Sequence, residues 1–466
     1  MSASSWARRR KVLTRLGLVG AAVALAVAAT AAVTASSAAV PASGTSRPGA
    51  PGAPGSPGAP GAPGFPGAPG FPGPPGFPSS PSAWSDWVTS WAASPQIPVP
   101  GTHAAAGFDN QTVRNIVFTS AGGTQIRLVL TNVFGTSPLQ VGDVTVAVAG
   151  SGAAVAPGTI HQVTVGGSTS FHIPPGAQVL SDPVAMRVAP LQNLAVSVYL
   201  PGQTGAATIH SDAQQVNWVS ATGDHAADAG AGAFTTQTRS WYYISGLIVG
   251  PSRVSGTVVA IGDSITDGFQ STAGANARWP NDLARRLNAL PGRTLSVADE
   301  GISGNRVLND ALCCGVNAEA RFERDALDQP GVRDIIVLEG INDIGISALS
   351  PGPVTGVSAA QVIAGYEQLI DQAHARGLKI FGGTLLPFKG CFYYTAAGEA
   401  ERQAVNGWIR SSGAFDGVID FDTLMADPAD PLALNPAWDS GDHLHPNDAG
   451  YRAMADSISL DMLLDG

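Results

Sequence analysis

Residues 258–272 read VVAIGDSITDGFQST, and this segment is the clearest indication of the fold class of the second half of the chain. Its apolar residues, 258–261, stop abruptly at Gly262, Asp263 and Ser264. A short apolar run that ends in small and polar residues is typical of a buried strand whose carboxyl end opens into a loop. The stretch therefore predicts that Ser264, a potential nucleophile, stands at the end of a strand.

The same alternation continues to the end of the chain. Apolar runs predict strands at 257–262, 295–299, 334–340, 379–387 and 418–422, and helical patterns occur at 279–290, 318–328, 358–376, 398–411 and 446–461. Near-continuous apolar strands that alternate with helices predict a parallel sheet covered by helices on both faces. In open sheets of this kind, functional sites lie beyond the carboxyl ends of the strands.

A different pattern precedes this region. From about residue 84 to residue 250, short runs such as VRNIVFTS and LAVSVYL alternate apolar with polar residues between clusters of Gly, Pro, Ser and Asn. Regularly spaced short strands with turn signals predict an antiparallel β-sandwich. Its scattered histidines, His161, His172 and His210, are interpreted as strand-surface or core residues rather than ligands.

The first residues predict export. Basic residues 8–11 precede an alanine-rich apolar run at 16–33, and small residues follow it, as in a secretory signal peptide. A retained membrane anchor is the less favoured interpretation, because the run is barely long enough to span a bilayer. The Arg9-Arg10 pair leaves the twin-arginine and the general export routes both open.

Residues 48–78 repeat glycine at every third position, usually with proline in the same triplet, which is the collagen pattern. A trimeric stalk is one interpretation, and a stiff polyproline-II spacer is the favoured one, because the repeat is short and carries three phenylalanines. The predicted organisation is a signal peptide at 1–42, a collagen-like Gly-x-Pro linker at 43–82, a β-sandwich domain at 83–250 and an α/β domain at 251–466.

The charge balance excludes two classes of partner. The 466 residues carry a formal net charge of -10, and removal of residues 1–39 takes away five basic residues and no acid, which moves it to -15. A protein of this charge is repelled by nucleic acid and by anionic membrane surfaces. The sequence therefore predicts no nucleic-acid partner and, with the apolar run assigned to a signal peptide, no stable membrane anchor.

Three cysteines, Cys313, Cys314 and Cys391, are present. In an exported protein we expect one disulfide, between Cys391 and either Cys313 or Cys314, which leaves one thiol unpaired. Three cysteines without a C-x-x-C pair make a poor zinc site, so they are interpreted as structural.

A serine needs a base to become a nucleophile, and the base needs an acid that orients it. The pattern Asp-x-x-His occurs at Asp371…His374 and at Asp442…His445. The first pair lies within a predicted helix, whereas the second lies in a loop that leads into the last helix. Loops at sheet ends carry functional sites more often than helix surfaces do, so Asp442 and His445 are the predicted partners of Ser264.

Ester hydrolysis also requires hydrogen-bond donors for the developing oxyanion. Gly304 follows the second predicted strand of the sheet, and its bare Cα lets a backbone N–H approach a substrate. Asn342 follows the third strand, and its side-chain amide can donate. With the N–H of Ser264, three donors are predicted to converge from three loops.

The segments GDSITDG, GISGN, GIND and DHLHPND, in this order, resemble the four blocks of the SGNH (GDSL) hydrolase superfamily over about residues 255–466. The resemblance implies a flavodoxin-like three-layer α/β/α domain that needs no cofactor or metal. It also implies that Ser264 is the nucleophile, that His445 and Asp442 complete the triad, and that Ser264, Gly304 and Asn342 form the oxyanion hole. The G-x-S-x-G elbow of ordinary α/β-hydrolases is absent from the sequence.

The predicted function is a secreted serine ester hydrolase that acts on O-acyl esters of small molecules or polysaccharides, with carbohydrate-linked acyl groups as one substrate class. An extracellular lipase or short-chain esterase is the alternative within the same chemistry. Two alternatives of other classes are a glycan-binding or stalk protein without activity and a metal site. The residues that would form the metal site share one loop: Asp439, Asp442, His443, His445 and Asp448.

Overall fold

The structure, a computed structural model, describes residues 86–292, 294–347 and 357–464. All of these belong to one compact unit, residues 74–466. The predicted signal peptide and collagen-like linker, 1–82, lie outside the described residues. None of the helices in the described segments is long and apolar enough to cross a membrane.

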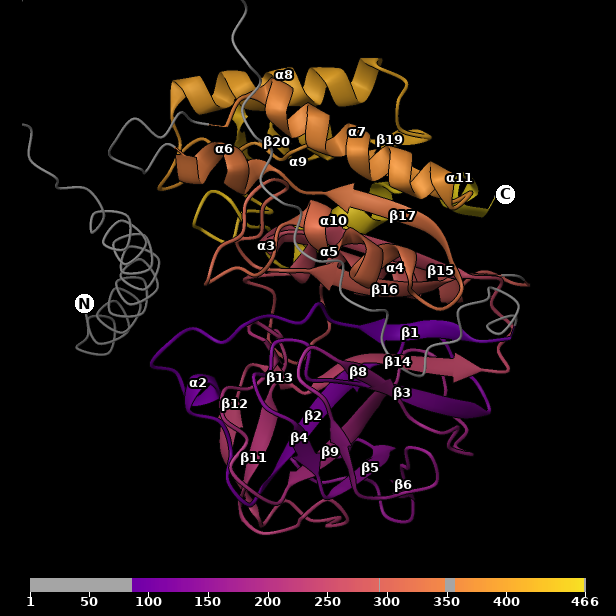
Figure 1. Cartoon of the computed structure of the whole chain (residues 1–466). Coiled ribbons are helices and arrows are strands. Elements are labelled where there is room, and N and C mark those ends of the chain that lie inside the picture. Colours follow the sequence, from indigo (N-terminus) through magenta and orange to yellow (C-terminus); the bar gives the residue numbers. More distant parts are fainter. Residues whose placement is uncertain (1–85, 293, 348–356, 465–466) are drawn as a thin grey trace, which may run out of the picture. The chain divides into compact units, whose positions relative to one another are not determined.

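The β-rich region precedes the α/β region. Its elements are β1 (Val88–Ala92), α2 (His103–Ala106), β2 (Gln111–Phe118), β3 (Gln125–Thr131), β4 (Leu139–Val141), β5 (Asp143–Val148), β6 (His161–Gln162), β7 (Phe171–Ile173), β8 (Gln178–Leu180), β9 (Asn193–Leu200), β10 (Ile209–His210), β11 (Asn217–Thr222), β12 (Phe234–Thr238), β13 (Trp241–Tyr242) and β14 (Ile244–Gly250). The larger strands form two antiparallel sheets, with orders β1-β14-β3-β8 and β12-β11-β2-β9-β5-β6. The predicted antiparallel region ahead of the parallel sheet is thus confirmed (Figure 1).

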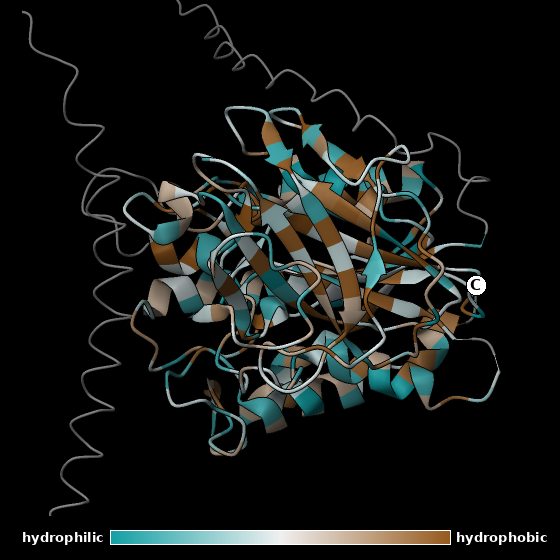
Figure 2. Cartoon of the chain, turned by 90° about the horizontal axis from the view of Figure 1, so that it is seen from below, coloured by the Kyte–Doolittle hydropathy of each residue, from teal (hydrophilic) through white to brown (hydrophobic). Residues whose placement is uncertain are grey.

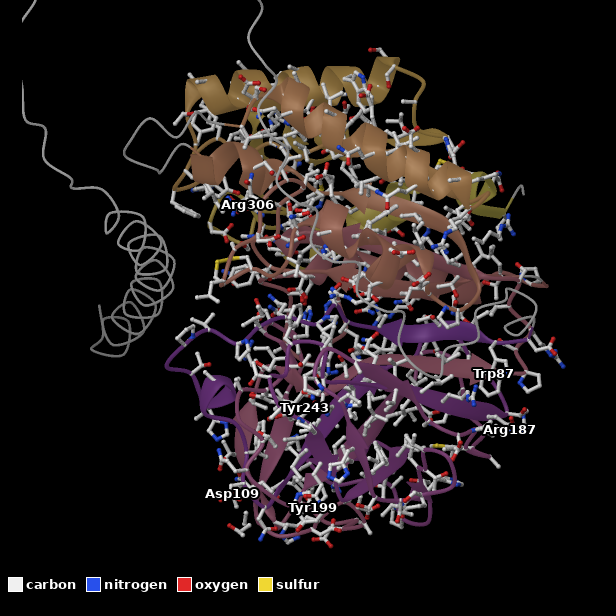
Figure 3. All side chains as sticks on the ribbon, in the orientation of Figure 1. Trp87, Asp109, Arg187, Tyr199, Tyr243 and Arg306 are labelled. Carbon is white, nitrogen blue, oxygen red and sulfur yellow. A yellow bond between two sulfur atoms is a disulfide. The ribbon has the colours of Figure 1, made fainter. Side chains whose placement is uncertain are left out.

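Alternating side chains explain why these two sheets face each other. Brown and pale bands alternate along many of the strands in Figure 2, as expected for strands with one apolar face. Val113, Leu128 and Val196, from β2, β3 and β9, are buried in one cluster that draws on both sheets. On the outer face of the smaller sheet Trp87 packs beside Val129, whereas Tyr243 is buried in the cluster between the sheets; Trp87 and Tyr243 are both labelled in Figure 3.

The α/β region follows from residue 257. Its strands are β15 (Thr257–Gly262), β16 (Ser296–Gly301), β17 (Val332–Leu338), β18 (Lys379–Gly383), β19 (Gly417–Ile419), β20 (Ala426–Asp427) and β21 (Asp430–Leu434). Its helices are α3 (Ser264–Asp267), α4 (Trp279–Asn288), α5 (Ala318–Phe322), the π-helical η2 (Glu323–Leu327), α6 (Ile341–Ser347), α7 (Ala359–Ala375), α8 (Ala396–Ser411), α9 (Phe421–Met425), α10 (Asp448–Ser457) and α11 (Leu460–Leu464).

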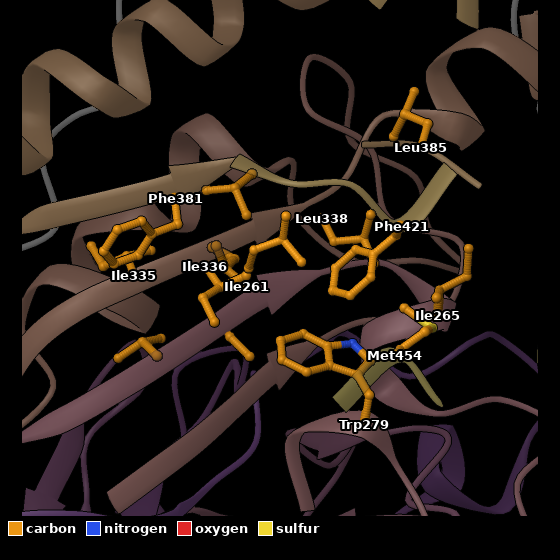
Figure 4. Close-up of a cluster of buried hydrophobic side chains, with 14 of the residues drawn as sticks. Ile261, Ile265, Trp279, Ile335, Ile336, Leu338, Phe381, Leu385, Phe421 and Met454 are labelled. Atoms are coloured by element: carbon orange, nitrogen blue, oxygen red, sulfur yellow. The ribbon is translucent and has the colours of Figure 1, made fainter. Parts of the chain in front are cut away.

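The central sheet is parallel, with the order β16-β15-β17-β18-β19. Helix α4 packs against α10, and α7 packs against α8 and α5 on the other side of the sheet, so the predicted three-layer α/β/α fold is confirmed. In Figure 4 Ile261 and Ile336 of the sheet lie in one cluster with Trp279 of α4 and Phe421 of α9. Burial of such side chains contributes about 1.5–3 kcal/mol each.

The two regions share a contact along β1 and β16, which lie beside each other in Figure 1. Ser94, just after β1, donates its hydroxyl to a carboxylate oxygen of Glu300 in β16 at 2.6 Å. The buried Arg321 donates to the Ser94 hydroxyl at 2.9 Å and to the Gly262 carbonyl at 3.1 Å. The β-rich region is thereby joined to the end of β15, two residues before Ser264.

Candidate active site

Ser264 is the first residue of α3, and only Asp263 separates it from the end of β15 at Gly262. Asp263 caps this helix, because its carboxylate accepts from the N–H of Ile265 at 2.9 Å. Gly262 is required by close packing, since a Cβ there would lie 2.3 Å from the Leu338 carbonyl oxygen. The turn thus places a serine that is 6% exposed at the carboxyl edge of the sheet.

His445 lies within hydrogen-bond distance of this serine. Its Nε2 is 2.8 Å from the Ser264 hydroxyl oxygen, and its Nδ1 is 2.7 Å from a carboxylate oxygen of Asp442. The ring of Phe269 meets the imidazole edge-on, with ring centroids 4.7 Å apart. The structure therefore brings together the three residues that the sequence predicted, in the order serine, histidine, aspartate.

The carboxylate of Asp442 is itself held by the loop. One oxygen accepts from the N–H groups of Leu444 and His445, at 3.0 and 2.9 Å, and the other accepts from the imidazole. Burial alone raises the pKa of Asp442, but the hydrogen bonds from His445 and the charge on its ring outweigh burial and bring the pKa below its ordinary value. Asp442 therefore stays ionised when it orients the imidazole.

Asn342 lies in the first turn of α6, which begins beyond the end of β17. Its amide donates to the Asn305 carbonyl at 3.0 Å, and its carbonyl oxygen accepts from the Tyr393 hydroxyl at 3.3 Å. These two bonds fix the orientation of the amide and use one of its two hydrogens. The second hydrogen remains for a ligand.

Gly304 has a φ of +79°, and a Cβ there would lie 2.5 Å from the Cys314 sulfur, so two independent constraints require glycine. Among the described residues, neither the N–H of Gly304 nor that of Ser264 has a hydrogen-bond acceptor. Unpaired N–H groups at a strand end are suited to bind a developing negative charge.

The predicted disulfide is wrong. Cys313 pairs with its neighbour Cys314, and Cys391 is free and buried. The physical reason lies in the loop around the pair, which Asn305 holds against Gly304 by donating to the carbonyls of Cys314 and Val316, both at 2.8 Å. Burial raises the pKa of Cys391 to about 11, so this thiol is poorly suited to react.

Arg306 stabilises the base of the same loop. Its guanidinium donates to the carbonyl of Asp310 at 2.6 Å, at the position labelled in Figure 3. Burial lowers the pKa of Arg306, and the negative charges of Asp343 and Asp310 offset part of this effect. Asn305 and Tyr393 contact the predicted oxyanion donor Asn342. Asn305 belongs to the GISGN block and Arg306 follows it, whereas no sequence signal points to Tyr393.

The competing histidines lie elsewhere or have other partners. His374, the base of the rejected pair, is exposed on α7 and contacts Asp416 rather than a serine. In the predicted metal loop His443 pairs with Asp439, while Asp448 accepts from the N–H of Thr272. Across 86–292, 294–347 and 357–464, no three histidine, cysteine or acidic side chains are grouped to hold a metal ion.

His210 is buried, as one of its two predicted interpretations allows, but it has a specific partner. Its Nε2 lies 3.1 Å from a carboxylate oxygen of Asp267, the last residue of α3. No sequence signal joins a strand of the β-rich region to the helix that carries Ser264. This contact is a further part of the site that sequence reasoning missed.

Comparison with protein families agrees with this geometry. Residues 260–453 match the model of the GDSL-like lipase/acylhydrolase family, and this span includes Ser264, Gly304, Asn342, Asp442 and His445. No curated protein sequence matches the chain.

Solved structures resemble only part of the chain. A catalytic mutant of an acetylxylan esterase from Geobacillus stearothermophilus is 21% identical over 45% of this chain and 94% of its own, with a TM-score of 0.35. A GDSL-like lipase from Bacteroides thetaiotaomicron is 17% identical over 46% and 90%, with a TM-score of 0.34. An α/β hydrolase enzyme from the metagenome of Lake Arreo is 21% identical over 44% and 93%, with a TM-score of 0.34.

Proposed function

We propose, on the premise that residues 260–453 form a GDSL-like lipase/acylhydrolase domain, that the protein is a secreted serine ester hydrolase that cleaves O-acyl esters. The carboxylic ester hydrolase class follows from the family. The observation that carries the proposed mechanism is the 2.8 Å contact between the Ser264 hydroxyl and Nε2 of His445. Export and an extracellular location belong to the proposal and rest on the amino-terminal sequence pattern.

The first step forms an acyl-enzyme. His445 accepts the Ser264 proton at Nε2 as the serine oxygen attacks the ester carbonyl. Asp442, hydrogen-bonded to Nδ1 at 2.7 Å, keeps the imidazole in the tautomer whose Nε2 can accept a proton. The same carboxylate then stabilises the imidazolium that forms.

The negative charge of the tetrahedral intermediate develops on the former carbonyl oxygen. The N–H groups of Ser264 and Gly304 and the free hydrogen of the Asn342 amide are its donors. Because Tyr393 and the Asn305 carbonyl already fix the amide, it needs no reorientation when the charge appears. His445 then protonates the departing alcohol, and a water molecule activated by the same histidine releases the acid.

The first test compares the wild-type protein, from residue 43 onward, with its Ser264→Ala variant on p-nitrophenyl acetate, butyrate and octanoate. We expect kcat/KM to fall by several orders of magnitude in the variant. Ser457→Ala is the matched control, because that serine is exposed on α10 and should leave the rate unchanged. Equal activity in wild type and Ser264→Ala would disprove the assigned nucleophile.

Carbohydrate-linked acyl groups are the substrate class we propose first, because two-domain secreted proteins of this superfamily with an amino-terminal β domain resemble carbohydrate esterases. Release of acetate from acetylated xylan, measured beside hydrolysis of a triacylglycerol, tests this choice. The reaction involves no metal, so we expect activity to persist in excess EDTA. The substrate is the partner that the proposal requires, and nucleic acid is not expected to bind.

One observation favours the second candidate, an esterase for longer apolar acyl chains. Phe392 and Leu312 are large apolar side chains that are 64% and 52% exposed, and burying their surface against an acyl chain would favour binding of that chain. Phe392 precedes Tyr393, the partner of Asn342, and Leu312 precedes the disulfide beside Gly304. A rate that increases from acetate to octanoate would support this alternative.

A further inference from the structure

His210 belongs to the β-rich region, yet it lies against the helix of the nucleophile. It is 3% exposed, and its Nδ1 is 3.0 Å from the backbone carbonyl oxygen of Ser94. Its Nε2 is 3.1 Å from Asp267 Oδ1, at the carboxyl end of α3. Because both ring nitrogens face oxygen acceptors, both carry hydrogens when Asp267 is ionised, and the imidazole is then a cation. Burial lowers the pKa of His210, but the charge and hydrogen bonds of Asp267 outweigh it and raise the pKa overall.

Asp267 joins α3 to the loop that carries Gly304. While Oδ1 contacts His210, Oδ2 accepts from the Ser303 N–H at 3.1 Å and from the Ser303 hydroxyl at 2.7 Å. Ser264 begins the same short helix, and Gly304 directly follows Ser303. A single carboxylate therefore sets the spacing between two of the three proposed oxyanion donors.

The segment after His210 contacts the same loop directly, and it reaches the backbone of Asp267 through Arg278. The Ser303 hydroxyl lies 3.3 Å from a carboxylate oxygen of Asp212. Arg278 donates to the Asp267 carbonyl at 2.6 Å and also to the carbonyl of Ala213. The β-rich region thus supplies three groups near Asp267: the imidazole of His210, the carboxylate of Asp212 and the carbonyl of Ala213. Only the imidazole contacts the Asp267 carboxylate directly.

We propose that His210 is a positioning residue for ester hydrolysis: through Asp267 and Ser303 it holds the Gly304 N–H in register with Ser264, so the β-rich region completes the active site. The proposal rests on the ester hydrolase function proposed above. His210 reaches no reacting atom and acts only through Asp267. Displacement of an oxyanion donor weakens transition-state stabilisation and leaves substrate binding in the ground state largely unchanged.

The test compares three variants of the secreted chain. His210→Ala removes the donor to Asp267, whereas His210→Gln retains an amide N–H of similar reach. His225→Ala is the matched control, because His225 lies in the same region and also pairs with an acid, Asp228, at 2.8 Å, without contact to α3. Titration with a fluorophosphonate, which reacts with competent serine nucleophiles, gives the concentration of active sites for each variant.

We expect His210→Ala to lower kcat per titrated site by about 10–100-fold, with KM changed less than about threefold. His210→Gln should recover kcat to within a few-fold of wild type, and His225→Ala should match wild type. A role confined to folding would instead lower the titratable fraction and leave kcat per site unchanged. That result would overturn the proposal, and so would a kcat per site in His210→Gln that is no higher than in His210→Ala.

Two further measurements keep the proposal testable. The first is used if His210→Ala does not fold, and the second is used if the wild-type protein shows no activity. If His210→Ala is insoluble, Ser303→Ala removes the 2.7 Å bond to Asp267 at a half-buried position, and an unchanged kcat per site would overturn the proposal. If wild-type protein hydrolyses no ester, the proposed function fails, and hydrogen exchange then tests the positioning by itself. Exchange in 264–269 and 301–305 should accelerate in His210→Ala relative to His225→Ala, and equal exchange would refute it.

Discussion

Two His–Asp pairs lie at opposite ends of the short helix α3, and they differ in what the histidine meets on its other side. His445 contacts Asp442 through Nδ1 at 2.7 Å and the Ser264 hydroxyl through Nε2 at 2.8 Å. His210 contacts Asp267 through Nε2 at 3.1 Å and the carbonyl oxygen of Ser94 through Nδ1 at 3.0 Å. The first histidine contacts a hydroxyl group, which can give up a proton, and the second contacts a backbone carbonyl, which cannot.

The third partner therefore decides the chemistry of the pair. A hydroxyl can donate to a lone pair on Nε2, so His445 can act as a general base. A carbonyl oxygen accepts only, so Nδ1 of His210 must donate; Nε2 donates to Asp267 when that carboxylate is ionised, and the ring then has no lone pair with which to take a proton. The same two residue types give a proton acceptor in one place and a fixed cationic bridge in the other.

The largest expected effect comes from removing the base. His445→Ala should lower kcat by about 10⁴-fold or more, because the Ser264 hydroxyl then has no proton acceptor. Steady-state kinetics on p-nitrophenyl acetate measure this loss. His443→Ala is the neighbouring control, since His443 is exposed and pairs with Asp439 instead. If His445→Ala lost no more activity than His210→Ala, the two histidines would not differ in role as described above.

A smaller effect is expected at the proposed oxyanion donors. Asn342→Ala should lower kcat by about 10²–10³-fold with little change in KM, since the amide acts on charge that appears only in the transition state. Tyr393→Phe removes only the hydroxyl that donates to Asn342 at 3.3 Å, so it should cost much less. Equal losses in the two variants would mean that Asn342 serves the fold rather than the oxyanion.

The sequence predicted the parts of the site that lie at the strand ends of the parallel sheet and in the loop before α10. The strand at 257–262 has the predicted bounds, and Ser264, His445 and Asp442 meet as expected. These residues are placed by local rules, namely apolar runs, turn residues and strand ends.

Contacts between the β-rich and the α/β regions were beyond those rules. His210 and Asp267 lie 57 positions apart in different regions, and no periodicity relates them. The cysteine pairing was wrong because sequence spacing does not determine connectivity; the loop conformation imposed by Asn305 does. The predicted helix at 446–461 begins only at Asp448, because Asn447 caps it, and it ends at Ser457.

The loop that contains the Cys313–Cys314 disulfide packs against Gly304, so changes in this loop test how strongly the position of Gly304 affects the rate. Reduction with a phosphine, or replacement of both Cys313 and Cys314 with serine, should lower kcat by about two- to tenfold, because the Cys314 sulfur packs against Gly304. The doubly substituted protein should no longer respond to reduction, which controls for effects on other groups. If reduction alters the double variant as much as wild type, the loop does not support the donor.

The smallest effect concerns stability and contrasts two acids on either side of Ser264. Burial raises the pKa of Asp263 to about 7, and Oδ2 of Asp263 has no hydrogen-bond partner among the described residues. Asp442, in contrast, has a lowered pKa through its bonds to His445. Asp263 thus holds a proton in the folded protein at pH values where the unfolded chain, with a pKa near 3.9, does not.

The sign of the pH effect follows from that difference. The stability contributed by the proton on Asp263 is fully present below about pH 4 and is lost as the pH rises through about 7. Asp263→Asn keeps an oxygen that can cap α3 but does not titrate, so its melting temperature should exceed that of wild type by a few degrees at pH 8. The gap should shrink at pH 6, where the wild-type carboxyl is protonated. Calorimetry at both pH values measures it, and a gap independent of pH would show that Asp263 is ionised in the folded protein, as Asp442 is.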